Sequence, residues 1–545
     1  MPPPVVPRRR TSGESLLFGS LLILHLAPIW LLPFIPTQDG PGHQALAFIL
    51  RHYDRPEAGI LREYYLPNRE ALPNWFFFFL MSKVLGFVSV PMAEKILLTA
   101  YVLLLPLSVR YALRTIDPRA GFLAALSFPF LYNFLFQMGF FNFCFSLAAF
   151  FFTLGYWLRS PERMTPVRTA GLALLILWVY LCHPVTLVVT VAALLTLAGW
   201  RTLLAFRREG LVPSFRKWLF GPILASLPAL LLTAVFVGRR TGAAILFPPL
   251  WGKVIHLAAL HSLASVDRWT VPLAVVFAFL FYAVAVSCLR ARGRRPPEAG
   301  DGLLLVLGVL LVAYFTAPSD LAGGGLIDHR LNLFPFLVLI LWFGTFEYPA
   351  VQRRRIQAAA TGTALAFLGL FVWKWIEIDD CLDEVLAAGR WIEPDHTVLF
   401  LSYAHQGETP AGGKLVFRSS PFVHAGGYLA ARKRLVDLSL YEANENYFPI
   451  YFEPRRSPYA HLASARLGIE LQPPRVDLLG YPGRTGGRVD YVLLWGLRDG
   501  RRSEPAVREV LRQLAAAYEP VHVSPGGRVR LFRLRPVFNL ERRGA

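Results

Sequence analysis

The sequence predicts an α-helical polytopic membrane protein that ends in a small α/β domain. Three observations support this prediction: 54% of the 545 residues are hydrophobic, only 17% are charged, and the formal net charge is +20. Soluble chains average about 45 to 50% apolar residues and about 25% charged ones, so both deviations indicate a membrane protein. The same apolar content excludes an intrinsically disordered chain.

The positive charge is concentrated in the first part of the chain. Residues 1–375 contain 33 Lys and Arg against 16 Asp and Glu, whereas residues 376–545 contain 23 against 20. Apolar runs of membrane-spanning length also end near Trp375. We therefore predict a membrane domain over residues 1–375 and a soluble domain over residues 376–545.

A helix needs about 20 mostly apolar residues to cross a bilayer, because each backbone polar group must be satisfied internally. The first such run, Ser15–Ile35, follows three arginines and lacks the small-residue cleavage pattern of a signal peptide, so we expect it to be the first span. The ten further predicted spans are 93–113, 120–135, 140–158, 169–181, 185–200, 218–238, 270–290, 302–317, 331–346 and 356–375.

Arginine clusters predict the orientation of these spans. All of them fall on one side of the membrane if residues 74–89 do not cross it, and the positive-inside rule makes that side the cytoplasm. The clusters lie within residues 110–119, 159–168, 201–217, 290–295 and 353–355. We therefore expect about eleven transmembrane helices in the inner (plasma) membrane, a re-entrant or interfacial helix at 74–89, a cytoplasmic N-terminus and an extracytoplasmic C-terminal domain.

Several classes of function lose support. The soluble domain has no stripe of basic residues interleaved with aromatic ones, so nucleic-acid binding is not expected. The spacings CxxC, HExxH, GxSxG and the P-loop are absent, which removes the common zinc, serine-hydrolase and nucleotide sites. Few charges lie within the predicted spans, which argues against a secondary transporter.

The first outer loop, within residues 36–92, holds the most informative ionisable group. Asp39 begins the string Asp39-Gly40-Pro41-Gly42-His43, which lies between the first span and an amphipathic helix. Two interpretations of Asp39 stay open: a reactive carboxylate at the membrane surface, or the N-cap of the helix that begins near Pro41. His43 is likewise either a helix-surface residue or part of a site.

After Asp39 and its helix come Leu66-Pro67-Asn68, Leu72-Pro73-Asn74-Trp75, a non-crossing apolar helix that ends at Gly86, and a span from Ala93. This order of elements over roughly the first 160 residues resembles the GT-C superfamily of membrane glycosyltransferases, in particular the protein O-mannosyltransferases and the lipid A aminoarabinose transferases. The DGPGH string is similar to one found in bacterial multi-spanning proteins of this kind.

The resemblance implies transfer of a sugar from a polyprenyl-phosphate-linked donor to a lipid, glycan or protein acceptor on the outer face. It implies that Asp39 is the catalytic carboxylate, as general base or metal ligand. Arginine suits the departing phosphate because of its fork of donors. The candidates for donor and phosphate binding are Arg330, His43, Asp328, His329, Arg239 and Arg240.

Structural roles remain open for the same residues. Arg330 could anchor a helix end, Asp328 could cap it, and Arg239 and Arg240 could bind lipid headgroups at the interface. An alternative function, a non-catalytic translocase of lipid-linked glycans or an assembly factor, would use the same cavity without chemistry.

The sequence does not identify a cofactor. Many relatives hold a second acid near the first-loop acid, but here Gln38 and Gly40 flank Asp39, and the next outer turn, 137–142, carries only amides. Divalent cations prefer several oxygen ligands, so a metal requirement is not expected. The Lys-Pro pattern of the aminoarabinose transferases is also missing before Pro67 and Pro73, so the substrate class does not carry over.

The soluble domain shows the pattern of a small α/β unit. Strands are predicted at His396–Tyr403 and Asp490–Trp495, a helix at Glu504–Tyr518, and a hairpin from Val521–Val523 and Val529–Leu534. An aromatic run could stack on sugar rings or pack in the core; it consists of Tyr441, Tyr447, Phe448, Tyr451 and Phe452.

Overall fold

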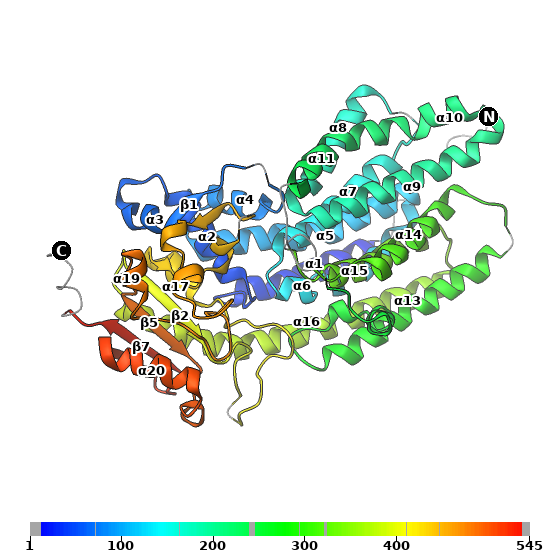
Figure 1. Ribbon diagram of the computed structural model, residues 1–545. Coiled ribbons are helices and arrows are strands. Elements are labelled where there is room, and N and C mark those ends of the chain that lie inside the picture. The colour runs from blue at the N-terminus through cyan, green and yellow to red at the C-terminus, as the bar shows by residue number, and fades with distance from the viewer. Residues whose placement is uncertain are drawn as a thin grey trace.

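The computed structural model describes residues 12–70, 72–162, 164–238, 246–293, 295–320, 324–409, 411–445 and 447–536. The molecule is elongated, with a helical bundle at one end and a small sheet domain at the other (Figure 1). Eight helices in these ranges are long and apolar enough to cross a membrane. The protein is therefore an α-helical, polytopic membrane protein with a small sheet domain, as the sequence predicts.

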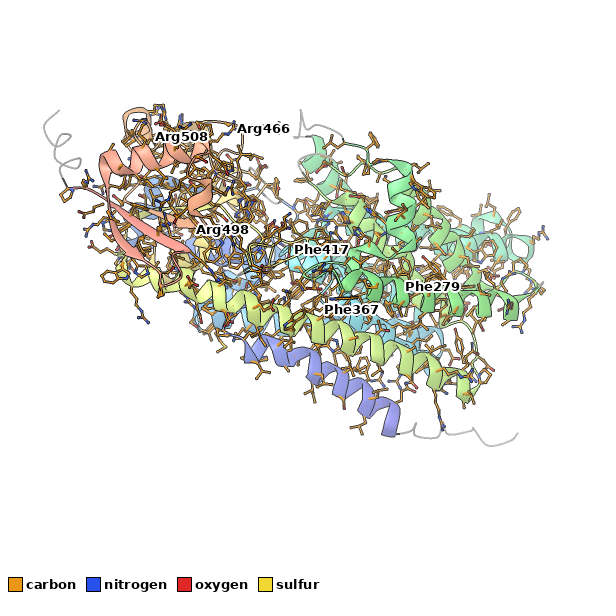
Figure 2. All side chains as sticks on the ribbon, turned by 90° about the horizontal axis from the view of Figure 1, so that it is seen from below. Phe279, Phe367, Phe417, Arg466, Arg498 and Arg508 are labelled. Carbon is orange, nitrogen blue, oxygen red and sulfur yellow. The ribbon has the colours of Figure 1, made fainter. Side chains whose placement is uncertain are left out.

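The bundle consists of long helices, most of which are joined by short connections. Helix α15 (Ile327–Phe343) runs through its centre, where every residue except His329 is buried. Outer helices instead expose apolar side chains, as a lipid-facing surface does: Phe279 on α13 is 65% exposed and labelled on the bundle in Figure 2, whereas Arg466, Arg498 and Arg508 lie on the sheet domain. The other long helices are α1 (Ser12–Leu31), α5 (Val90–Ile116), α7 (Phe141–Leu158), α8 (Pro166–Cys182), α9 (Pro184–Glu209), α11 (Phe220–Gly238), α13 (Thr270–Arg292), α14 (Gly302–Thr316) and α16 (Ala350–Ala387).

The predicted span at 120–135 differs from the others. Its residues form a 3₁₀-helix, η2 (Pro118–Phe130), followed by the short helix α6 (Phe134–Gln137), rather than a continuous α-helix. All residues from Ala120 to Phe130 are buried, and η2 packs against α5 and α16. η2 is therefore surrounded by protein and not by lipid. Irregular backbone at membrane depth is tolerated in such an environment. Hydropathy alone could not distinguish this geometry.

The first outer loop folds into short elements. These are α2 (Gly40–His52), η1 (Pro56–Ala58), α3 (Gly59–Tyr64), β1 (Tyr65–Pro67) and α4 (Phe76–Val84). Helix α4 has nine residues, so its length of about 14 Å is well below the ~30 Å of a bilayer core. This length fits the interfacial helix expected at 74–89.

The C-terminal domain contains a five-stranded sheet in the order β3-β2-β5-β7-β6. Strand β2 is parallel to β3 and β5, and β7 is antiparallel to β5 and β6. The predicted strands, helix and hairpin lie close to their expected positions: β2 (Thr397–Ser402), β5 (Tyr491–Trp495), α20 (Pro505–Ala517), β6 (Tyr518–Val523) and β7 (Val529–Leu534). The short strand β3 (Val436–Asp437) has no counterpart in the prediction.

The helical bundle and the C-terminal domain are connected both by a continuous helix and by contacts of the first outer loop. Helix α16 continues through Trp375, the predicted boundary, to Ala387. The first outer loop also belongs to the joint: β1 pairs antiparallel with β4 (Ile450–Phe452), and α2 packs on α17 (Gly426–Lys433). The segment that carries Asp39 is therefore held against the C-terminal domain.

The remaining described helices are short. They are α10 (Leu211–Trp218), α12 (Leu250–Ala258), η3 (His261–Leu263), η4 (Ala299–Asp301), η5 (Ala388–Trp391), η6 (Tyr441–Asn444), η7 (Pro454–Arg456), α18 (Pro458–His461), α19 (Tyr481–Thr485) and η8 (Asp499–Arg501).

Candidate functional site

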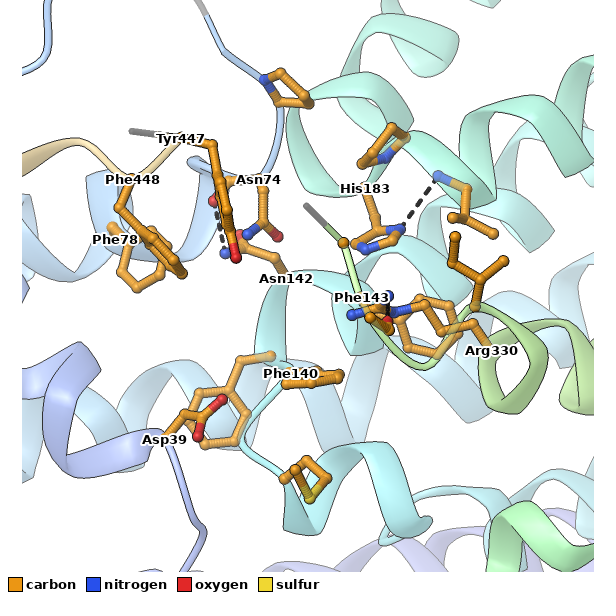
Figure 3. Close-up of a pocket in the computed structure, with 18 of the residues that line it drawn as sticks. Asp39, Asn74, Phe78, Phe140, Asn142, Phe143, His183, Arg330, Tyr447 and Phe448 are labelled. Carbon is orange, nitrogen blue, oxygen red and sulfur yellow. Dashed lines mark hydrogen bonds between the residues drawn. The ribbon is translucent and has the colours of Figure 1, made fainter. Parts of the chain in front are cut away.

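A cavity of about 450 Å³ lies where the helical bundle meets the C-terminal domain (Figure 3). Its wall combines the first outer loop, the turn before α7, the starts of α9 and α15, the end of α11, and loops of the C-terminal domain. The polar residues that line it are Gln38, Asp39, His43, Asn74, Asn142, His183, Thr233, Arg330, His424, Tyr441, Tyr447 and Glu470.

Asp39 lies at the N-cap position of α2, but its side chain makes no capping hydrogen bond. The Tyr441 hydroxyl donates to Oδ2 at 2.9 Å, and the Gln38 amide donates to Oδ1 at 3.2 Å. His424 Nε2 lies 3.8 Å from the same Oδ1. The carboxyl group therefore faces the cavity and the C-terminal domain, and the N-cap interpretation of its side chain is wrong.

The backbone around Asp39 is held by the turn that precedes α7. The amide of Gln38 donates to the Gln137 carbonyl at 3.0 Å, and the amide of Asp39 donates to the Met138 carbonyl at 3.2 Å. Gly139 adopts a φ of +85°, and a Cβ there would lie 2.9 Å from the Asp39 nitrogen. Only glycine combines this left-handed conformation with so close an approach.

Burial controls the acidity of Asp39. It raises the pKa of the carboxyl from 3.8 to about 7, although the hydrogen bonds from Tyr441 and Gln38 oppose it. The charge of Glu470 also raises this pKa, whereas that of Arg330 lowers it. A carboxyl that titrates near neutrality can both accept and release a proton, which suits general acid–base chemistry.

Removing the Tyr441 hydroxyl should change this balance. In Tyr441→Phe the charged form of Asp39 loses a donor, so its pKa should rise above about 7 and less carboxylate should be present at neutral pH. We expect the pH profile of any activity that needs the carboxylate to shift upward. The matched control is Tyr518→Phe, because the Tyr518 hydroxyl donates to the Val489 carbonyl at 2.9 Å, outside the cavity. An unchanged profile in Tyr441→Phe would contradict the expectation.

Arg330 supplies the cation of the cavity. Its side chain is buried, with a residue exposure of 8%, and one Nη donates to the Gly325 carbonyl. The guanidinium lies over the rings of Phe140 at 4.7 Å and Phe143 at 5.9 Å. Its Nε has no partner, and it forms no ion pair with another described residue. Figure 3 shows Phe140 between Arg330 and Asp39. A buried cation without a counter-ion favours binding of an anion.

Of the other predicted site residues that the structure describes, one lines the cavity and two do not. His43 lines the cavity, where its ring packs on Phe78 at 4.8 Å and its Nε2 lies 3.9 Å from Glu442 Oε1. Asp328 and His329 do not line it, because consecutive helical residues point about 100° apart. His329 instead packs near His256 and His261. Arg239 and Arg240 lie outside the described residues.

Several residues that line the cavity were not predicted from the sequence to be site residues. Tyr441 belonged to the aromatic run, but no local signal marks His424 or Glu470. His183 also lines the cavity, and its side chain caps α9. Because the Val185 amide donates to its Nδ1 at 3.3 Å, the neutral ring carries its proton on Nε2.

Within the described ranges, no group of three or more His, Cys, Asp and Glu side chains is arranged to hold a metal ion. No protein-family model matches the chain, and no curated protein matches it. What the protein does therefore has to be inferred from the chemistry of the cavity.

Proposed function

We propose that the protein is an integral-membrane glycosyltransferase of the GT-C type. It would move a sugar from a polyprenyl-phosphate-linked donor to a lipid, glycan or protein acceptor on the outer face. One observation carries the proposal: Asp39, a carboxyl group with a pKa of about 7, and Arg330, a buried cation that forms no ion pair with a described residue, line one cavity at the end of a membrane bundle.

The two groups suit the two halves of the reaction. Asp39 takes the proton of an acceptor hydroxyl while the oxygen attacks the anomeric carbon of the donor sugar. The bond between that carbon and the phosphate oxygen breaks, and prenyl phosphate departs with the electron pair. Arg330 offsets the negative charge of the departing phosphate. Tyr441 positions the Asp39 carboxyl through its hydrogen bond.

The remaining wall of the cavity suits a lipid-linked donor. Val185 and Val188 from α9 and Phe236 and Val237 from α11 form an apolar side. Val188 is 58% exposed and Val237 is 51% exposed, although both belong to helices of spanning length. A prenyl chain could leave the cavity along these residues into the bilayer, while the sugar stays near Asp39.

The topology supports an outer-face site. Helix α5 ends at Ile116, and η2 then leads the chain back to Met138, whose carbonyl binds the Asp39 amide. At about 2.0 Å per residue, the 13 residues of η2 cover about 26 Å, close to a bilayer core. With η2, α8 and α15 added to the eight long helices, the proposed topology has eleven passes. In that topology the positive-inside rule favours an inner (plasma) membrane protein with Asp39 and the C-terminal domain outside the cytoplasm.

A transfer assay tests the proposal directly. Membranes from a deletion strain are supplied with a radiolabelled polyprenyl-phosphate sugar, with and without the purified protein. We expect label to move from the donor to an acceptor only when the protein is present. Donor binding without product would overturn the proposal and favour a lipid-linked glycan translocase or an assembly factor.

Arg330 allows a separate test of the donor site. Arg330→Ala should raise the KM for the donor by about tenfold or more, because a charge-assisted hydrogen bond to phosphate is lost. The KM of Arg330→Lys should lie between those of the wild-type protein and Arg330→Ala, because lysine keeps the positive charge but not the paired donors of the guanidinium. Arg432→Ala is the matched control: Arg432 also covers a phenylalanine ring, at 4.5 Å from Phe34, but it lies outside the cavity. An unchanged KM in Arg330→Ala would exclude this role.

A further inference from the structure

A second cavity, of about 700 Å³, lies at the other end of the bundle. Helix α15 connects the two cavities, because Arg330 at its start lines the first and Gly344, just after its end, lines the second. The ends of α5 and α13, the start of α14 and the middle of α9 complete the wall. The charged lining residues are Asp117, Arg119, Arg201, Arg292, Arg295, Glu298, Asp301 and Glu347.

The acidic residues of this cavity are already engaged. Arg119 forms ion pairs with Asp117 and Glu347, and Arg292 holds both oxygens of Asp301 at 2.7 and 2.8 Å.

The fourth acid, Glu298, forms a capping box with Asp301 at the start of η4. Arg201 and Arg295 are different, since neither forms an ion pair with a residue that the structure describes. Two guanidinium groups without an ion-pair partner among the described residues, half-buried Arg201 and exposed Arg295, therefore line the cavity.

Arg201 is not explained by its place in the helix. It lies more than two turns before α9 ends at Glu209, whereas the helix dipole acts only within the last turn. Its guanidinium is flanked by the rings of Trp157 at 5.7 Å and Trp218 at 5.1 Å. Both indole N–H groups are buried and have no acceptor among the described residues. Neither tryptophan lines the cavity itself. Glu162 is near enough for its charge to act on Arg201, but it forms no ion pair with it. Among the described residues, no side chain accepts a hydrogen bond from either indole or pairs with the guanidinium.

We propose that this second cavity binds a phosphate group, with Arg201 and Arg295 as its ligands. Guanidinium groups bind phosphate oxygens through paired, charge-assisted hydrogen bonds. The cavity is lined by four arginines and four acids, so the phosphate would be held by the two guanidinium groups that form no ion pair with a described residue, not by a net positive charge. The phosphate can belong to an anionic phospholipid or to a free phosphate compound. The site is independent of the transfer reaction at Asp39.

Two ligand measurements distinguish these sources. In the first, the protein is placed in nanodiscs of phosphatidylglycerol and phosphatidylcholine, and retained lipids are counted by native mass spectrometry. In the second, lipid-depleted protein is titrated with inorganic phosphate and pyrophosphate. Enrichment of phosphatidylglycerol identifies the lipid headgroup. Phosphate binding without lipid enrichment identifies a free phosphate compound.

The variants connect either result to the cavity. The double variant Arg201→Gln with Arg295→Gln should reduce binding of the preferred ligand by about tenfold or more. Arg208→Gln is the matched control, because Arg208 is exposed on the same helix and lies outside the cavity. If the double variant does not fold, Arg201→Lys with Arg295→Lys keeps both charges and should show weaker binding from loss of the forks. The proposal would be overturned if the double variant bound both phosphatidylglycerol and the phosphate compounds as well as the wild-type protein does.

Discussion

Replacing Asp39 with asparagine should reduce sugar transfer by about 10²- to 10⁴-fold, the usual contribution of a general base. The amide can still accept the hydrogen bond from Tyr441, which is 2.9 Å away, but it cannot take a proton from an acceptor. In the wild-type protein the pKa of Asp39 is about 7, so the active carboxylate form should increase as the pH rises through 7. The pH profile of the transfer rate should show this rise, and the residual rate of Asp39→Asn should lack it.

The control for this substitution is Asp54→Asn. Asp54 belongs to the same outer loop but is exposed and does not line the cavity. We expect Asp54→Asn to keep full activity, and both variants to insert into the membrane and melt like the wild-type protein. Full transfer activity in Asp39→Asn would contradict the assignment of the base.

Gly427→Ala should destabilise the protein and reduce transfer as well. A Cβ at Gly427 would lie 2.4 Å from the carbonyl oxygen of Pro41, at the contact between α17 and α2. Alanine normally stabilises a helix by about 1 kcal/mol relative to glycine. Here, however, the new Cβ would meet backbone atoms of α2, which cannot rotate away as a side chain could. We expect a net loss of about 1 to 3 kcal/mol, the usual cost of overpacking, measured by thermal unfolding of the purified protein. The shift of α2 should also move Asp39 away from Tyr441.

Gly500→Ala provides the matched comparison. No atom lies within 4 Å of a Cβ built at Gly500, which is on the C-terminal domain away from both cavities. It should unfold and act like the wild-type protein. A Gly427→Ala variant with unchanged stability would show that α2 and α17 can separate without cost, and that their contact does not position Asp39.

The elements that the sequence predicted well depend on local pattern. Long apolar runs predicted the membrane helices, and short apolar runs predicted β2 and β5. In both cases the apolar composition of the segment itself indicates that it is buried. Asp39 could be selected in the same way, since two glycines and a proline beside an acid mark an irregular turn at the end of a span. The same pattern left its role undecided between cap and reactive group.

What only the tertiary structure decided depends on contacts between distant segments. Asp39 and Tyr441 are 402 positions apart, and their hydrogen bond shows that the Asp39 side chain points to the C-terminal domain and does not cap α2. Arg330 lines the cavity that holds Asp39, whereas Asp328 and His329 do not, because the rotation of α15 in the bundle sets which side chain faces inward. The 3₁₀ geometry of η2 likewise requires α5 and α16 around it. Composition and period determine which segments are buried, but only packing determines which polar groups meet.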